Sequence, residues 1–217
     1  MKEYVESLER EFGAIEKGFL VEQRRAQADL ASCDHEDAVR LAQLAYRSDV
    51  YQVRMYGVFL LGYLSRDDAV LAFLRETVSE DPNWRVQEVL AKAFDEFCAA
   101  TGYEGALAVI DDWLGDERAN VRRAVTEGLR IWTSRPYFKE HPREAIERLA
   151  GLRGDGSEYV RKSVGNALRD ISKRFPEMVA AELDTWNLER REAQQVHRLA
   201  SKLIERPASA DRLMFRG

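Results

Sequence analysis

The chain has little of several residue types that mark common protein classes. Only two cysteines, Cys33 and Cys98, occur in 217 residues, and they lie far apart. We expect both to be reduced thiols on or near buried helix faces, as in a cytoplasmic protein rather than a disulfide-stapled secreted one. The three histidines, His35, His141 and His197, show no metal-ligand spacing with one another or with the cysteines. The sequence therefore predicts no metal site, and nothing in it suggests a cofactor.

Long apolar runs are also missing. No run approaches the roughly 18 residues that a membrane-spanning helix needs, and charged residues make up 33% of the chain. The first six residues, MKEYVE, are acidic and amphipathic, which is unlike a secretory signal. No Ser/Gly-rich linker divides the sequence. We expect one cytoplasmic domain without membrane contacts, with N-terminal helices in 1–47, repeats in 48–206 and a frayed tail in 207–217.

One short pattern occurs four times. It consists of a polar turn followed by a valine that opens an amphipathic helix, and its copies read SDVYQVR, DPNWRVQ, DERANVR and DGSEYVR. The valines stand at 53, 86, 121 and 160, at intervals of 33, 35 and 39 residues. Such periods are typical of two-helix repeats, in which each unit buries its apolar face by stacking on the next. The pattern predicts an all-α, HEAT-like solenoid with a concave groove.

Helical periodicity extends through almost the whole chain, and no convincing alternating strand occurs. Short breaks at glycine, proline and aspartate separate the segments, and the longest break is expected at 134–141. The expected helices cover residues 3–14, 18–33, 36–47, 50–65, 67–79, 83–101, 103–114, 118–134, 142–152, 157–174, 176–186 and 189–206.

The four repeat helices share one apolar stripe. Positions 0, 4, 7, 8 and 11 from each valine are nearly all apolar or small and cluster within one arc of a helix. Positions 2, 6, 9 and 10 lie opposite or at the margin and are mostly polar in the second, third and fourth copies. In the first copy these positions are apolar, so we expect the N-terminal helices to cover them. In the other three copies the positions hold Glu88, Lys92, Asp95, Glu96, Arg123, Glu127, Arg130, Lys162, Asn166, Arg169 and Asp170, with Ile131 as the one apolar member.

A second set of polar residues has a structural interpretation. Gln87, Arg122 and Arg161 each follow a turn aspartate by six residues. That spacing suits capping of the turn or pairing across stacked repeats, so we assign these side chains to the scaffold.

The charge is unevenly distributed. The net charge is −5, but residues 121–217 hold 20 Lys+Arg against 14 Asp+Glu, whereas residues 1–120 hold 13 against 24. A basic surface on an acidic protein can bind phosphates, because binding depends on the local patch. Composition alone favours solvated faces of mixed charge, and carboxylates interleaved with arginines can be an ordinary ion-pair ladder.

Two stretches resemble the HEAT-like bacterial DNA alkylation-repair glycosylases of the AlkC and AlkD families, and the resemblance is nearer to AlkC. Residues 121–128, VRRAVTEG, are similar to that family's V-R-R-x-x-S/T-E-G helix. Residues 159–173, YVRKSVGNALRDISK, with Pro176 and Trp186 after them, resemble its Y-V-R-K-S-V-A-N-x-L-N-D-I-x-K block. Residues 1–80 match only as generic helical repeats.

The resemblance implies excision of N-alkylated bases, such as 3-methyladenine, from duplex DNA. It places the family's catalytic carboxylates on Glu127 and Asp170, with Glu88 as the candidate for a third. Substrate-binding aromatic rings would correspond to Trp132, Trp84 and Tyr137. Phosphate-binding cations would be Arg123, Arg130, Lys162, Arg169 and Lys173.

This sequence departs from the family's pattern in two places. Trp132 comes earlier than the family's groove tryptophan and falls on a core position, and the segment around Tyr137 is the alternative source of the missing aromatic side chain. Arg169 replaces an asparagine of the family's second motif. Both changes concern recognition of the damaged base rather than the fold.

The implied chemistry suits carboxylates and needs no metal or cofactor. A base alkylated at a ring nitrogen is cationic, and its departure leaves an oxocarbenium-like sugar that a fixed carboxylate stabilises. A second carboxylate can orient or deprotonate the attacking water. The alternative is a non-catalytic repeat scaffold that binds DNA or a protein partner. We expect a monomer, although the sequence leaves the oligomeric state open.

Overall fold

The computed structural model describes residues 1–204, and the tail expected to fray lies outside these residues. All regular structure in this part of the chain is helical, which confirms the all-α expectation. The chain divides into two compact units, Met1–Glu140 and one that begins at His141. We expected one domain; whether the two units form a single continuous array stays a prediction.

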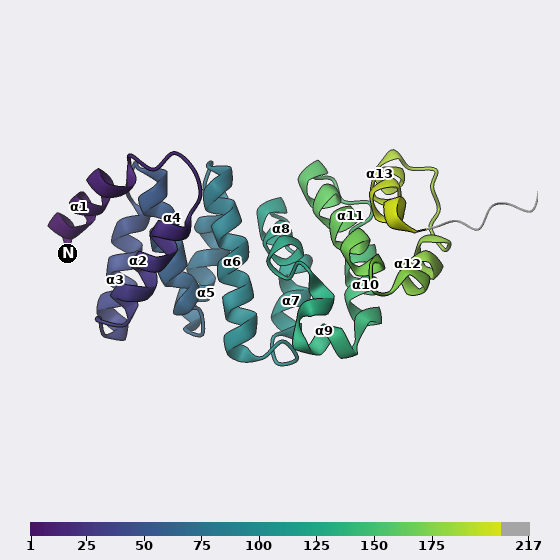
Figure 1. The fold of residues 1–217 in the computed structure, drawn as a ribbon, viewed down its shortest axis with the longest axis horizontal. Helices are drawn as coiled ribbons and strands as arrows, with labels where there is room; N and C mark the ends of the chain where they lie inside the picture. The colour runs from purple at the N-terminus through teal and green to yellow at the C-terminus, as the bar shows by residue number, and fades with distance from the viewer. Residues whose placement is uncertain (205–217) are drawn as a thin grey trace, which may run out of the picture. The chain divides into compact units, whose positions relative to one another are not determined.

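The first unit is a succession of helices joined by short connections, and Figure 1 labels its helices α1 to α9. Its α-helices are α1 (Lys2–Phe12), α2 (Leu20–Leu30), α3 (His35–Tyr46), α4 (Tyr51–Tyr63), α5 (Asp68–Glu76), α6 (Trp84–Thr101), α7 (Leu107–Leu114), α8 (Ala119–Gly128) and α9 (Pro136–Glu140). Two 3₁₀ turns accompany them, η1 (Val78–Glu80) and η2 (Trp132–Ser134).

The second unit is smaller and contains the fourth copy of the repeat. Its elements are α10 (Pro142–Gly151), α11 (Glu158–Ser172), α12 (Pro176–Leu183), α13 (Arg191–Ala200) and the 3₁₀ turn η3 (Ser201–Leu203). Proline occupies the first position of both α10 and α12, where its missing N–H costs least.

The repeat helices are α4, α6, α8 and α11, and the apolar stripe predicted for each of them is buried. Val53, Val86, Val121 and Val160 all have 0% of their surface exposed. Position 11 is buried as well, including Trp132, where the third copy has already left its helix. The predicted core of the repeats is confirmed.

The helices of successive repeats approach closely where glycine faces a neighbouring backbone. A Cβ atom on Gly62 of α4 would lie 2.9 Å from the Ala93 Cα of α6, and one on Gly128 of α8 would overlap the Ala91 carbonyl oxygen of α6. Helix α6 is thus packed between α4 and α8 through small residues.

The polar turn of each repeat is an Asx- or Ser-type turn. The side chains of Ser48, Asp81, Asp116 and Asp155 each accept the backbone N–H two residues later, at 2.7–3.1 Å. Their main-chain carbonyls then accept hydrogen bonds from the side chain six residues on, which is Arg54, Gln87, Arg122 or Arg161. The structural assignment of Gln87, Arg122 and Arg161 is confirmed, and the acceptor is the aspartate carbonyl rather than its carboxylate.

The carboxylates of two of these turns, Asp81 and Asp116, pair with arginines from other helices. Arg54 of α4 donates to Asp81 at 2.8 Å, and Arg75 of α5 donates to Asp116 at 2.8 Å. The hydrogen bonds from Arg118, and then the one from Arg75, lower the pKa of Asp116. The turns at Asp81 and Asp116 therefore tie the first three repeats together by charge as well as by packing.

The expected helices are all present, but two boundaries in the third repeat were wrong. The helix expected at 118–134 ends at Gly128, and the expected break at 134–141 contains α9. Leu129 and Trp132 are buried, so the apolar period continues although the backbone has left the helix. The apolar periodicity predicts which residues are buried. It does not predict that the helix ends at Gly128, because the apolar spacing continues beyond that residue.

The N-terminal helices cover the apolar outer face of the first repeat, as predicted. Met55 and Phe59 of α4 are 1% and 3% exposed. Phe19, just before α2, contacts the Phe59 ring at a centroid distance of 5.9 Å, and Gln23 of α2 donates to the Tyr63 hydroxyl at 3.4 Å. Phe19 and Gln23 also line a cavity together with residues of α6 and α8.

Candidate functional site

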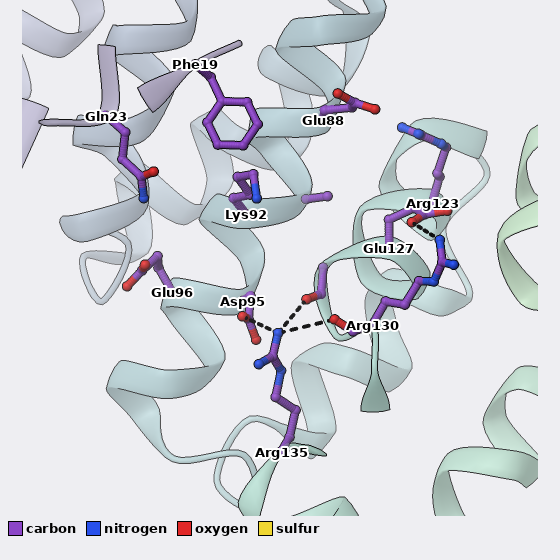
Figure 2. Close-up of a pocket in the computed structure, with 12 residues that line it drawn as sticks. Phe19, Gln23, Glu88, Lys92, Asp95, Glu96, Arg123, Glu127, Arg130 and Arg135 are labelled. Carbon is purple, nitrogen blue, oxygen red and sulfur yellow. Dashed lines mark hydrogen bonds and ion pairs between the residues drawn. The ribbon is translucent and has the colours of Figure 1, made fainter. Parts of the chain in front are cut away.

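The polar faces of α6 and α8 line one cavity in the first unit, of about 360 Å³. Figure 2 shows its lining side chains, which come from α6, α8, the start of α2 and the segment after α8. We call it the α6–α8 cavity, and its charged residues are Glu88, Lys92, Asp95, Glu96, Arg123, Glu127, Arg130 and Arg135. Within this unit, the predicted polar positions of the second and third copies therefore do converge.

Two of the three predicted carboxylates belong to the cavity. Glu88 of α6 is half-buried and its side chain accepts no hydrogen bond or ion pair from the described residues. Glu127 of α8 accepts from Arg130, one turn later, at 3.4 Å, and 24% of its side chain is exposed. The long distance makes this a weak pair that a ligand can exchange.

A third acid at the wall, Asp95, is held by the scaffold. Arg135 donates to its carboxylate at 2.6 Å, and the Tyr103 hydroxyl donates at 2.9 Å. The same Arg135 nitrogen reaches the carbonyl oxygens of Gly128 at 3.2 Å and Arg130 at 3.5 Å, as Figure 2 shows. Burial raises the pKa of Asp95 despite these cationic and hydroxyl partners. Arg135 thus joins α6 to the end of α8 and fixes the wall of the cavity.

Asp170 lies on α11, which belongs to the second unit. Only 6% of its side chain is exposed, and Lys173 donates to it at 2.8 Å while Arg169 lies 3.7 Å away. Lys162 of the same helix pairs with Glu158 at 2.7 Å. The predicted residues of α11 therefore carry ion pairs along their own helix, and a catalytic part for Asp170 stays a prediction.

The three predicted aromatic residues have different environments. Trp132 is 0% exposed, packs on Phe138 at a centroid distance of 4.9 Å and donates from its indole N–H to the Thr126 carbonyl at 3.4 Å. The prediction that Trp132 contacts a substrate is wrong, because its ring completes the core of the third repeat. Tyr137 is half-buried and packs edge-on against Phe138.

Trp84 is the exposed member of this set. It is the first residue of α6, 58% of its surface is exposed, and it precedes Glu88 by four residues. Residues four apart lie on the same helix face. Trp84 is therefore on the same side of α6 as Glu88, one turn before it, although it does not itself line the cavity.

Sequence reasoning missed the contributions of Phe19 and Gln23 to the cavity. The ring of Phe19 lies under the Lys92 ammonium, 4.5 Å from the ring centroid, and both residues line the wall. The apolar outer face of the first repeat had indicated a cover. It carried no signal that this cover would reach the polar face of the second repeat.

Residues 1–204 contain neither a candidate metal site nor a candidate membrane span. Among the described residues, no group of three or more His, Cys, Asp or Glu side chains could hold a metal ion. In the same part of the chain, every helix is too short or too polar to cross a membrane. Both cysteines are free thiols, Cys98 buried and Cys33 half-buried.

Comparison with known proteins assigns the chain to a protein family. Residues 17–204 match the family described as DNA alkylation repair enzyme. The chain belongs to this family. AlkD2 from Streptococcus mutans is similar to it at 62% identity and a TM-score of 0.94, over 94% of this chain and 99% of that one.

The alkylpurine DNA glycosylase AlkC of Pseudomonas fluorescens, solved bound to DNA containing an abasic site analog, is similar at 26% identity and a TM-score of 0.64. That match covers 92% of this chain but 61% of AlkC. The expectation that the chain lies nearer to AlkC than to AlkD is therefore wrong, and the HEAT-like repeat fold is confirmed. An 87-residue stretch is also 38% identical to the uncharacterized protein YhaZ of Bacillus subtilis, covering 24% of that protein.

Proposed function

We propose that this member of the DNA alkylation repair enzyme family excises cationic N-alkylated bases, such as 3-methyladenine, from duplex DNA. The observation that carries the proposal is the convergence of Glu88 and Glu127 on one cavity whose cations include Arg123. DNA as partner is supported by the similarity to AlkC, whose structure holds DNA with an abasic site analog.

In this proposal the carboxylates make the main contribution to stabilising the transition state of base excision. Alkylation at a ring nitrogen makes the base a better leaving group, and cleavage leaves positive charge at C1′ of the sugar. A Glu127 carboxylate fixed beside that carbon stabilises the developing cation more than it stabilises the bound substrate. Glu88, without an internal partner, accepts a hydrogen bond from the attacking water or takes its proton.

Recognition of the base and of the backbone falls to neighbouring residues. The exposed face of Trp84 attracts a cationic base by about 0.5–2 kcal/mol. Arg123 at the wall contacts a phosphate. When a DNA phosphate competes for Arg130, the weak pair with Glu127 opens and the carboxylate becomes available to the sugar.

The test is release of 3-methyladenine from methylated duplex DNA. Glu127→Gln lowers the single-turnover rate by about 10²–10³, because the neutral amide cannot stabilise the cationic sugar. Glu88→Gln lowers it less. Glu104→Gln, an exposed glutamate in the turn before α7, serves as the control with wild-type rate. Full activity in both cavity variants would remove the roles assigned here.

A second function is favoured by the charge balance of the cavity. Its lining holds four carboxylates and four cations, and two of the carboxylates are ion-paired. A non-catalytic scaffold that grips DNA, or a protein partner, fits such a surface equally. Duplex binding without base release by the wild-type protein would establish this function in place of excision.

A further inference from the structure

An arginine beside the cavity contacts two aromatic rings. The guanidinium carbon of Arg85 lies over the Trp84 ring, 4.4 Å from its centroid, and over the Tyr51 ring, 5.4 Å from its centroid. Tyr51 and Arg85 are half-buried, whereas Trp84 is 58% exposed. We call these three residues the Arg85 clamp.

The repeat explains why the clamp forms. Tyr51 and Trp84 each precede the repeat valine by two residues and are the first residues of α4 and α6. Helices α4 and α6 belong to consecutive repeats and pack against each other. The Asn83 side chain accepts the Arg85 backbone N–H at 2.9 Å, which fixes the first turn of α6. Equivalent positions in stacked repeats therefore bring both rings to one guanidinium.

The clamped guanidinium has no acceptor. Within residues 1–204, its N–H groups donate no hydrogen bond and form no ion pair. Two arginines of this unit differ in having a carboxylate partner: Arg54 binds Asp81 at 2.8 Å, and Arg135 binds Asp95 at 2.6 Å. An arginine that is held in place by rings but lacks a carboxylate has its donors available to an external anion.

We propose that the Arg85 clamp binds a phosphodiester group of DNA. The proposal rests on the proposed function only in taking DNA as the partner. Contact with the rings orients the cation, and the planar fork of N–H donors matches two phosphate oxygens. Trp84 shares its helix face with Glu88 of the cavity, about one turn away, about 6 Å along the axis. The bound phosphate therefore lies close to the nucleotide that enters the cavity.

The test compares the salt dependence of binding to an undamaged labelled duplex. Arg85→Gln removes one phosphate contact, so the slope of log affinity against log salt falls by about 0.9, and affinity falls roughly five- to tenfold at 0.1 M salt. Arg85→Lys keeps the slope but binds more weakly, because an ammonium lacks the planar fork.

Arg66→Gln is the matched control. Arg66 is exposed and follows the opposite end of α4 from Tyr51, about 20 Å away by helix rise. Its slope remains that of the wild type. Equal melting temperatures establish that the variants remain folded.

Trp84 supplies an independent readout. Trp113, Trp132 and Trp186 are 1%, 0% and 7% exposed, so quenching by a soluble quencher reports mainly on Trp84. DNA protects Trp84 from the quencher in the wild type, and this protection is reduced in Arg85→Gln.

The outcomes separate this inference from the proposed function. If Arg85→Gln has the slope and the Trp84 protection of the wild type, the clamp is not a phosphate site, although DNA binding and excision stand. If the wild type binds DNA with the predicted Arg85 dependence but releases no base, the clamp stands and excision fails. If the wild type binds no duplex at all, both are overturned.

Discussion

Glu22 of α2 is a carboxyl group buried without a partner. It is 0% exposed, and neither carboxylate oxygen accepts a hydrogen bond from the described residues. Burial raises the pKa of Glu22, because a charge is costly where water is excluded. The ionised form therefore destabilises the folded protein, and this cost grows as the pH rises from the pKa of the unfolded chain through that of the folded one.

We predict that Glu22→Gln stabilises the protein at neutral pH by about 1 kcal/mol. The gain shrinks toward pH 4, where wild-type Glu22 is protonated and resembles the amide. Urea unfolding of both proteins between pH 4 and pH 8 measures it. Glu104→Gln, whose side chain is exposed, shows no such pH-dependent gain. A constant difference across this range would contradict an ionisation effect.

At the scale of single residues, the sequence predicts burial better than contacts. The stripe positions are buried as expected, and Trp132 proved to be core because its position mattered more than its resemblance to a groove aromatic. The pairing of Arg135 with Asp95 was not foreseen. These residues are 40 positions apart, and their meeting depends on the turn after Gly128, which no periodicity reveals.

At the scale of helices, the contact between α6 and α8 depends on Gly128. We predict that Gly128→Ala destabilises the protein by about 2 kcal/mol, since a Cβ atom there overlaps the Ala91 carbonyl oxygen and α8 must move. Because Glu127 is the preceding residue, the shift also lowers any excision rate. Chemical denaturation and the release assay measure the two effects.

Gly151 provides the matched control for this substitution. It is the last residue of α10, and a Cβ atom added there meets nothing within 4 Å. Gly151→Ala is therefore neutral or slightly stabilising, by at most about 1 kcal/mol. Similar losses in both variants would mean that helix propensity, rather than close packing, governs Gly128.

The elements themselves were largely predictable because stacking helices must keep a periodic apolar stripe. The cover formed by α2 could be inferred from the apolar outer face of α4. The participation of Phe19 and Gln23 in the α6–α8 cavity could not, because it depends on how a segment without a repeat motif crosses its neighbours. Local sequence patterns predict single helices well. A site that several helices build together can be predicted only when the packing of those helices is known.

For the whole molecule, the uneven charge makes a quantitative prediction about DNA binding. The chain is acidic overall, yet residues 121–217 hold 20 Lys+Arg against 14 Asp+Glu. Each phosphate contact contributes about 0.9 to the salt slope. If Lys162 of α11 is one of these contacts, Lys162→Gln lowers the slope by about that amount and weakens binding equally for all sequences.

The wild-type pairing of Lys162 does not prevent this contact. Its ion pair with Glu158 joins two side chains that are 53% and 57% exposed, and such surface pairs are worth at most about 1 kcal/mol. A duplex phosphate can therefore displace Glu158. Lys17→Gln, an exposed change in the connection between α1 and α2, leaves the slope unaltered. Equal slopes for the wild type and Lys162→Gln would show that the positive charge of the C-terminal half serves solubility or internal pairing, and that DNA is held by the first unit alone.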